Sequence, residues 1–238
     1  MVPEGAASWR YSWDRYLAAL LVLAAIAYLA FSGAGRQMWR DYWAHRHFLA
    51  GAQALGRAKV DLAEREFESA ARLASPAQNM QATIAFDYLV FHMPDAAAPY
   101  ARAALPTTSD ALLLAALGNE FLQVGRRSDA EPLFDRALRI SPNDAEVLNT
   151  IGYAYAVAGI QLTRAELLLK RALGLKPDAP HIVDSLGWTY YKMGEFSQAV
   201  PLLEQANKGM PGNPEILGHL RLARDALNQA HPNAPGSP

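Results

Sequence analysis

Apolar residues in the C-terminal half of the chain recur with the spacing of an amphipathic helix, and the whole pattern repeats about every 34 residues. Three segments, beginning at Ala111, Ala145 and Pro180, align with one another. Each has an early glycine, an aromatic residue, a second glycine, two alanines and a closing proline. The equivalent positions are Gly118, Gly152 and Gly187; Phe121, Tyr155 and Tyr190; Gly125, Gly159 and Gly194; Ala130, Ala165 and Ala199; Ala137, Ala172 and Ala206; and Pro142, Pro177 and Pro211.

This pattern predicts a helix, a turn and a second helix in every unit. The apolar residue before the early glycine and the aromatic residue after it share one face of the first helix, because they are four positions apart. The small residues are expected where the two helices of a unit approach closely. The second glycine favours a turn, and the proline ends the second helix. A single unit cannot bury both apolar faces, so the units are expected to stack into a solenoid.

The repeated positions resemble the tetratricopeptide repeat, a 34-residue helix-turn-helix unit. Two departures stand out: the consensus tryptophan of the first helix is replaced by Leu114, Leu148 and Val183, and the middle unit has one extra residue between Gly159 and Ala165. The resemblance implies an all-α fold, a right-handed solenoid of this repeat type. It covers residues 111–213 with three clear repeats.

The flanking segments are less regular. Residues 44–110 are predicted to form two degenerate repeats. Gly51, Ala63, Phe67 and Ala70 lie at the expected offsets in residues 44–77, whereas residues 78–110 keep only Ala96, Tyr100 and Ala103. Residues 214–230 read as one amphipathic helix that caps the last apolar face of the solenoid. The composition of residues 231–238 predicts a disordered tail.

The N-terminal region contains a continuous apolar run. Residues 16–35 hold no charged side chain and, as a helix, span about 30 Å, the thickness of a bilayer's hydrocarbon core. We therefore expect an N-terminal tail (1–15), one transmembrane helix (16–35) and a membrane-interface linker (36–43), with lipid contacted by residues 9–43. A cleaved signal peptide and a buried core helix are the alternatives. The flanking arginines are nearly balanced, so the short tail favours an N-terminus inside and repeats outside the cytoplasm, in the periplasm or its equivalent.

Small residues recur within this apolar run. Ala18, Ala25 and Ser32 are spaced seven residues apart, on one face of a helix. Small side chains let helices approach closely in lipid, so this stripe is a candidate for packing within the membrane. The alternative is that alanine is simply tolerated in an apolar span.

The composition of the chain excludes several classes of function. The formal net charge of −1 argues against a nucleic-acid-binding protein, which needs a basic surface. The absence of cysteine excludes disulfides, thiol catalysis and zinc–thiolate sites. His45 and His47 are two positions apart and do not share a helix face, and the grouping of His181, Asp184 and Ser185 is interpreted as incidental. We expect no catalytic site, no metal and no cofactor, and therefore no enzyme.

The family resemblance places candidate binding residues on the first helix of each unit, which lines a groove in arrays of this kind. Aromatic rings with amides suit a peptide or a helix as ligand. The alternative is that Tyr153 and Trp188 pack between neighbouring units. The groove residues carried over are Asn119, Gln123, Asn149, Tyr153, Asp184, Trp188, Tyr191 and Lys192.

The sequence therefore predicts a membrane-anchored scaffold for other proteins. As its main role we expect an accessory subunit or assembly factor of a membrane protein complex. An adaptor or chaperone-like protein that binds peptides, with the transmembrane helix only as an anchor, is the alternative.

Overall fold

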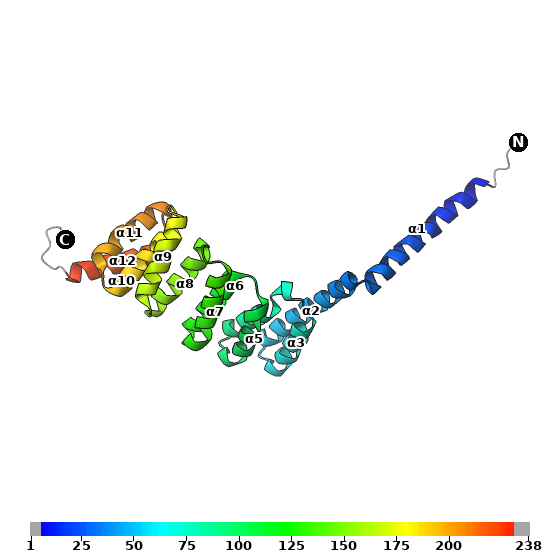
Figure 1. The fold of residues 1–238 in the computed structure, drawn as a ribbon, viewed down its shortest axis with the longest axis horizontal. Helices are drawn as coiled ribbons and strands as arrows, with labels where there is room; N and C mark the ends of the chain where they lie inside the picture. Colours follow the sequence, from blue (N-terminus) through cyan, green and yellow to red (C-terminus); the bar gives the residue numbers. More distant parts are fainter. Residues whose placement is uncertain (1–5, 231–238) are drawn as a thin grey trace. The chain divides into compact units, whose positions relative to one another are not determined.

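The computed structural model describes the backbone of residues 6–230 (Figure 1) and the side chains of residues 15–28 and 32–230. Over this range the chain forms twelve α-helices and one 3₁₀ turn, and no strand occurs in it. The predicted all-helical solenoid of tetratricopeptide type is confirmed. The chain divides into two compact units, Met1–Met80 and Gln81–Pro238. The predicted disordered tail (231–238) and the start of the predicted N-terminal tail (1–5) lie outside the described residues.

The first unit contains α1 (Ala6–Phe31), α2 (Gly33–Gly56), α3 (Val60–Leu73) and the turn η1 (Pro76–Gln78). The helix predicted for residues 16–35 breaks at Ser32, whose hydroxyl accepts a hydrogen bond from the Gly35 N–H at 3.0 Å and so caps α2. Serine is a favoured N-cap because its oxygen satisfies an N–H that has no partner within the helix. In the structure, Ser32 is therefore the N-cap of α2, and residues 36–43, the predicted membrane-interface linker, lie within that helix.

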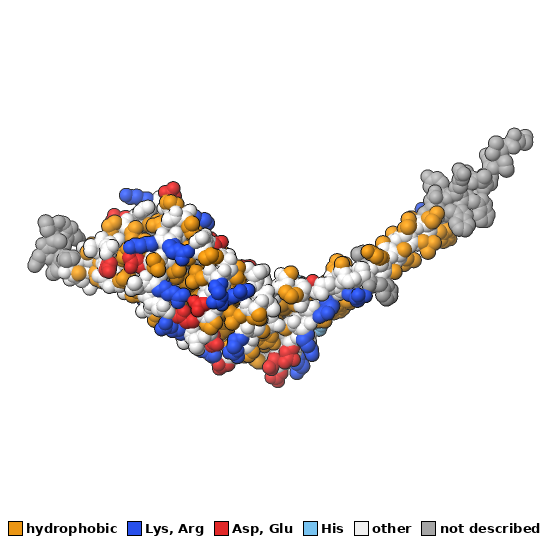
Figure 2. Space-filling model, in the orientation of Figure 1, with side chains coloured by type: hydrophobic (Ala, Val, Ile, Leu, Met, Phe, Trp, Pro, Cys, Tyr) orange, Lys and Arg blue, Asp and Glu red, His pale blue; other side chains and the backbone are white. Residues whose placement is uncertain are grey.

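The apolar part of α1 is exposed on every side. Every residue from 15 to 28 is exposed, Ala18 and Ala25 included, and hydrophobic side chains run along this part of the helix in Figure 2. Within the described residues, no single helix meets the length and hydropathy expected of a membrane span. Residues Arg15–Tyr28 and Gly33–Gly56 meet these criteria only together, as a pair bent by 75°.

The second unit is a series of helix pairs closed by a single helix. The pairs are α4 (Met80–Val90) with α5 (Pro94–Thr107), α6 (Ala111–Gln123) with α7 (Arg127–Ile140), α8 (Ala145–Ala158) with α9 (Leu162–Leu175), and α10 (Pro180–Met193) with α11 (Phe196–Gly209); α12 (Pro214–Ala230) follows. The first helices α6, α8, α10 and α12 each contact the next, so they form one continuous layer.

The same turn joins the two helices in all five pairs, including α2 and α3. A residue with positive φ follows the first helix, and the next N–H bonds to a carbonyl five residues earlier, as from Arg126 to Phe121 at 2.8 Å. Glycine takes the positive-φ position in the three regular pairs, whereas Ala58 (φ 56°) and His92 (φ 57°) take it in the two degenerate ones. The extra residue of the middle unit is accommodated at Gln161, which is also left-handed (φ 48°).

The early glycines lie where the two helices of a unit contact each other closely. A Cβ on Gly118 would lie 2.6 Å from the ring of Phe134, which is fully buried. The same arrangement recurs for Gly51 with Phe67, Gly152 with Leu169 and Gly187 with Leu203, at 2.6–2.8 Å. The predicted close approach of the paired helices at these positions is confirmed.

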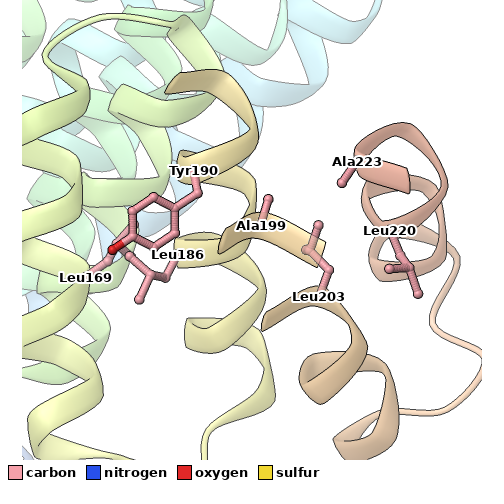
Figure 3. Close-up of a cluster of buried hydrophobic side chains, with 7 residues drawn as sticks. All are labelled: Leu169, Leu186, Tyr190, Ala199, Leu203, Leu220 and Ala223. Carbon is pink, nitrogen blue, oxygen red and sulfur yellow. The ribbon is translucent and has the colours of Figure 1, made fainter. Parts of the chain in front are cut away.

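Neighbouring pairs are joined by buried apolar contacts and by a repeated hydrogen bond. The Tyr155 hydroxyl donates to Glu131 at 2.7 Å, and the Tyr190 hydroxyl donates to Glu166 at 3.0 Å. Burial, and then the bond to Glu131, raise the pKa of Tyr155, so this hydroxyl stays protonated and remains a donor. Figure 3 shows the last core cluster, in which α12 supplies Leu220 and Ala223 against side chains of α9, α10 and α11: Leu169, Leu186, Tyr190, Ala199 and Leu203.

Candidate functional site

The layer of first helices has one side that is not covered by the second helices. We call this surface the first-helix face. On α6 and α8 its residues are four positions or three positions apart, which places them on one stripe of each helix. It consists of Leu112, Ala116, Asn119 and Gln123 on α6; Glu146, Thr150, Tyr153 and Val157 on α8; and His181, Trp188 and Lys192 on α10.

The α6 part of this face is open. Leu112 is 45% exposed, and Asn119 and Gln123 are half-buried and exposed respectively. Both amides donate to the Glu120 carboxylate over a long 3.4 Å, so they retain capacity for other partners. The two candidate residues on α6 therefore lie where a ligand can reach them.

The α8 part combines an apolar residue with two polar groups. Val157 is 41% exposed. Asn149 lies beside this stripe, and no donor within the described residues reaches its buried side-chain oxygen. Tyr153 is different, because its hydroxyl donates to Glu215 of α12. Burial, and then this bond, raise the pKa of Tyr153, so the phenol remains a donor at neutral pH.

The α10 part is covered by α12. Asp184 is 5% exposed, and both its oxygens lie within hydrogen-bonding distance of the His219 ring, at 3.0 and 3.1 Å. The Trp188 ring stacks with His219, with 4.1 Å between ring centres, and with Tyr191, with 4.7 Å between ring centres. Asp184 and Trp188 therefore contact the chain's own last helix, and Tyr191 packs on Trp188 and Phe196.

Lys192 remains exposed beside Trp188. Its ammonium lies 5.7 Å from the centre of the Trp188 ring, within range of a cation–π contact. The Trp188 indole nitrogen is buried, and no acceptor from the described part of the chain reaches it. The stack thus leaves one charged group at the surface and one unused donor beneath it.

Sequence reasoning missed Glu215 and His219, the α12 residues that occupy this region. One signal was available. His219 follows Asp184 by 35 residues, the interval that also separates Asn149 from Asp184 and Tyr153 from Trp188. The cap therefore continues the register of the repeats and contacts the same row of positions.

The chemistry available on this surface is hydrogen bonding and apolar contact. Within the described residues, no group of three His, Asp or Glu side chains is arranged to hold a metal ion. The α6 and α8 parts of the face offer amides, a tyrosine already bound to Glu215, and the exposed aliphatic side chains of Leu112 and Val157. These groups suit the backbone and side chains of another polypeptide.

Comparison with known proteins identifies the repeats. Residues 113–148 and 182–213 match the family model of the tetratricopeptide repeat. No curated protein matches the chain. The chain therefore contains tetratricopeptide repeats, and proteins built from such repeats mediate protein–protein interactions.

Several solved structures share the fold. One is YrrB, described as a tetratricopeptide repeat protein with an unusual peptide-binding site, with 20% identity, a TM-score of 0.52 and coverage of 74% of this chain and 90% of that one. MamA has 15% identity and a TM-score of 0.51 over 82% of this chain and 98% of that one. PilF of Pseudomonas aeruginosa has 18% identity and a TM-score of 0.51 over 83% and 95%. At these identities the likeness shows the fold alone.

Proposed function

We propose that this chain is a membrane-anchored scaffold that holds a segment of another protein on the α6–α8 part of the first-helix face. In this proposal it acts as an accessory subunit or assembly factor of a membrane protein complex. The repeats lie outside the cytoplasm, and the N-terminal helix anchors them. The observation that carries the binding proposal is the juxtaposition of exposed apolar side chains and available amides on α6 and α8.

The composition of this surface supports a polypeptide ligand. Leu112 near the start of α6 and Val157 near the end of α8, at 45% and 41% exposure, offer apolar surface to a ligand. Asn119 and Gln123 can pair with backbone N–H and C=O groups, since an amide both donates and accepts.

The exposure of α1 supports the anchor. A helix that is apolar on all sides is stable only when something other than water surrounds it. Residues 15–28 are exposed all round, and the hydrophobic side chains among them include Leu17, Leu20, Leu21, Val22, Leu23 and Ile26. A bilayer provides such an environment. The break at Ser32 places the end of this segment next to α2, within the first unit.

The binding surface is tested by paired charge substitutions. Leu112→Glu with Val157→Glu changes the proposed face, whereas Leu167→Glu with Leu175→Glu changes two exposed leucines of α9, at 61% and 49% exposure. Each full-length variant is purified in mild detergent, and the proteins that accompany it are identified by mass spectrometry. We expect only the first variant to lose the partner that the parent retains. Equal retention by both variants would remove binding from the α6–α8 surface.

Two further experiments separate the subunit from the adaptor and fix the side of the membrane. Replacing residues 16–31 by an unrelated transmembrane helix should dissolve the complex if the chain is a subunit that packs within the membrane, and should leave binding intact if the helix is only an anchor. A C-terminal reporter that is active only in the cytoplasm should stay silent. Strong activity would place the repeats inside the cell.

A further inference from the structure

The amphipathic pattern of α2 is the reverse of that of an ordinary surface helix. Ala44 and Gly51 are buried on the side that packs against α3. The side that points away from α3 carries large apolar and aromatic residues instead. Their exposed fractions are 62% for Met38, 63% for Trp39, 52% for Tyr42, 40% for Trp43 and 49% for Leu49.

The polar side chains of α2 are engaged on its protein side. Asp41 accepts hydrogen bonds from the Ser75 N–H at 2.9 Å and from Gln37 at 2.8 Å. Arg40 donates to the Arg72 carbonyl at 3.2 Å. His47 and Glu66 are paired at 2.6 Å. These polar side chains of α2 are therefore engaged within the first unit, whereas its large apolar side chains are exposed.

The exposed rings form a cluster with basic residues around it. Trp39, Tyr42 and Trp43 lie 5.7–6.0 Å apart, centre to centre. Arg46 is exposed and falls within this stripe at helical spacing. Residues 33–49 contain three arginines and a single acidic residue, so this part of α2 is positively charged. Indole and phenol rings with arginine are the side chains that favour the headgroup layer of a membrane.

The apolar face of α2 lies on the inner side of the bend between α1 and α2. A hollow of about 930 Å³ lies there, lined by Ile26 of α1 and by Met38, Trp39 and Tyr42 of α2. If residues 15–28 cross a bilayer near its normal, the 75° bend brings the axis of α2 to within about 15° of the membrane plane. The aromatic face is then turned toward the bilayer, and α3 lies on the opposite side of α2.

From this geometry we infer that residues 36–49 of α2 bind along the surface of a bilayer that contains anionic lipid, with the Met38–Trp39–Tyr42 face in the headgroup layer. The inference rests on the membrane anchoring proposed above. It adds a second, surface-bound element that sets the direction in which the chain leaves the membrane. The occupant is lipid because the apolar surface is continuous with α1 at the bend and because the charge of this segment complements anionic headgroups.

Single spin labels test the depth of each segment, since the chain has no cysteine of its own. Met38→Cys probes the face, Leu23→Cys probes α1, and Glu68→Cys on the exposed side of α3 is the control. Each labelled full-length chain is reconstituted in vesicles of phosphatidylcholine and phosphatidylglycerol, and collision rates with oxygen and with a water-soluble nickel chelate are measured. We expect the Met38 label at the boundary of headgroups and acyl chains, roughly 5–10 Å deep, the Leu23 label in the hydrocarbon core, and the Glu68 label in water.

Other outcomes separate this inference from the proposed anchor. A Met38 label as accessible to nickel as the Glu68 label, with Leu23 in the core, overturns the inference and leaves the anchor in place. A Met38 label at the headgroups with Leu23 in water supports the inference and overturns the anchor. Strong spin–spin broadening at Met38 shows that a second copy of the chain covers the face, which also overturns the inference.

The requirement for anionic lipid is tested by charge reversal. Arg46→Glu should move the Met38 label outward in vesicles with phosphatidylglycerol, and Arg65→Glu on the exposed side of α3 should leave it unchanged. The same label should lie less deep in vesicles of phosphatidylcholine alone. Equal depth in both kinds of vesicle, with no effect of Arg46→Glu, overturns the assignment to anionic lipid.

Discussion

Gly118→Ala tests whether the early glycines are required by helix contact. Two effects of the new methyl group oppose each other. An alanine in a helix interior is more favourable than glycine by about 1 kcal/mol. At Gly118, however, the new Cβ would lie 2.6, 2.8 and 3.2 Å from three ring atoms of Phe134. That ring is fully buried and packs edge-on against Tyr155 at 5.3 Å, so it cannot swing away freely.

The clash should outweigh the gain in helix propensity. Overpacking a core typically costs about 1–3 kcal/mol, and three close contacts with an aromatic ring place this site toward the upper end. We expect a net loss of about 1–2 kcal/mol, which lowers the melting temperature of a domain of this size by about 2–8 °C. The second unit is therefore expected to unfold at a lower temperature while its helical content at room temperature stays unchanged.

Gly174→Ala provides the matched control. Gly174 is also in a helix, but nothing lies within 4 Å of the position of its Cβ. The same methyl group there should only gain helix propensity and raise the melting temperature slightly. Circular dichroism melts of both purified full-length variants, beside the parent, measure the difference.

A double-mutant cycle assigns the cost to the contact. Phe134→Val removes the ring atoms that the methyl group meets, so Gly118→Ala should cost little in that background. If Gly118→Ala raises the melting temperature as Gly174→Ala does, or costs as much with Phe134→Val as without it, the close-contact explanation of the repeated glycines is wrong.

Three further predictions follow from the turns, the ion pairs and the ring stack. Ala58→Gly should stabilise the first unit by about 0.5–1 kcal/mol in a thermal melt, because its φ of 56° strains an L-residue, whereas Gly125→Ala (φ 76°) should destabilise the second. A hydrogen bond from Lys176 is the main cause that lowers the pKa of Glu146 in the folded protein. The ionised Glu146 therefore stabilises the fold fully above pH 4.5, its ordinary pKa, and this stabilisation is lost as the pH falls further. Glu146→Gln should accordingly lower the melting temperature at neutral pH and lower it less in acid. Trp188→Ala should lower the free energy of unfolding by about 2–3 kcal/mol, which is less than the loss expected for truncating a fully buried tryptophan. An unchanged melting temperature would show that the ring stack does not stabilise the fold.

The repeat architecture was predictable because it is encoded within short stretches of chain. The interval between Gly118 and Gly152, the positive-φ turns at Gly125 and Gly159, and the 3.6-residue apolar period each act over a few residues. Such local preferences agree with one another in every unit, so a single sequence specifies the helix pairs. The degenerate pairs have the same turn although alanine and histidine replace the glycine, because the bonding pattern of the backbone, not the side chain, closes it.

The surfaces of the molecule depended on tertiary structure. The hydropathy of residues 16–35 predicts one continuous helix, but the Ser32 hydroxyl caps a new helix there, and contact with α3 determines which face of α2 is left exposed. Asp184 and Trp188 are residue types that suit a binding groove, but whether a ligand can reach them depends on where α12 packs. Because His219 contacts them from 35 residues away, only the assembled helices determine that Asp184 and Trp188 are covered while Leu112 of α6 and Val157 of α8 remain exposed.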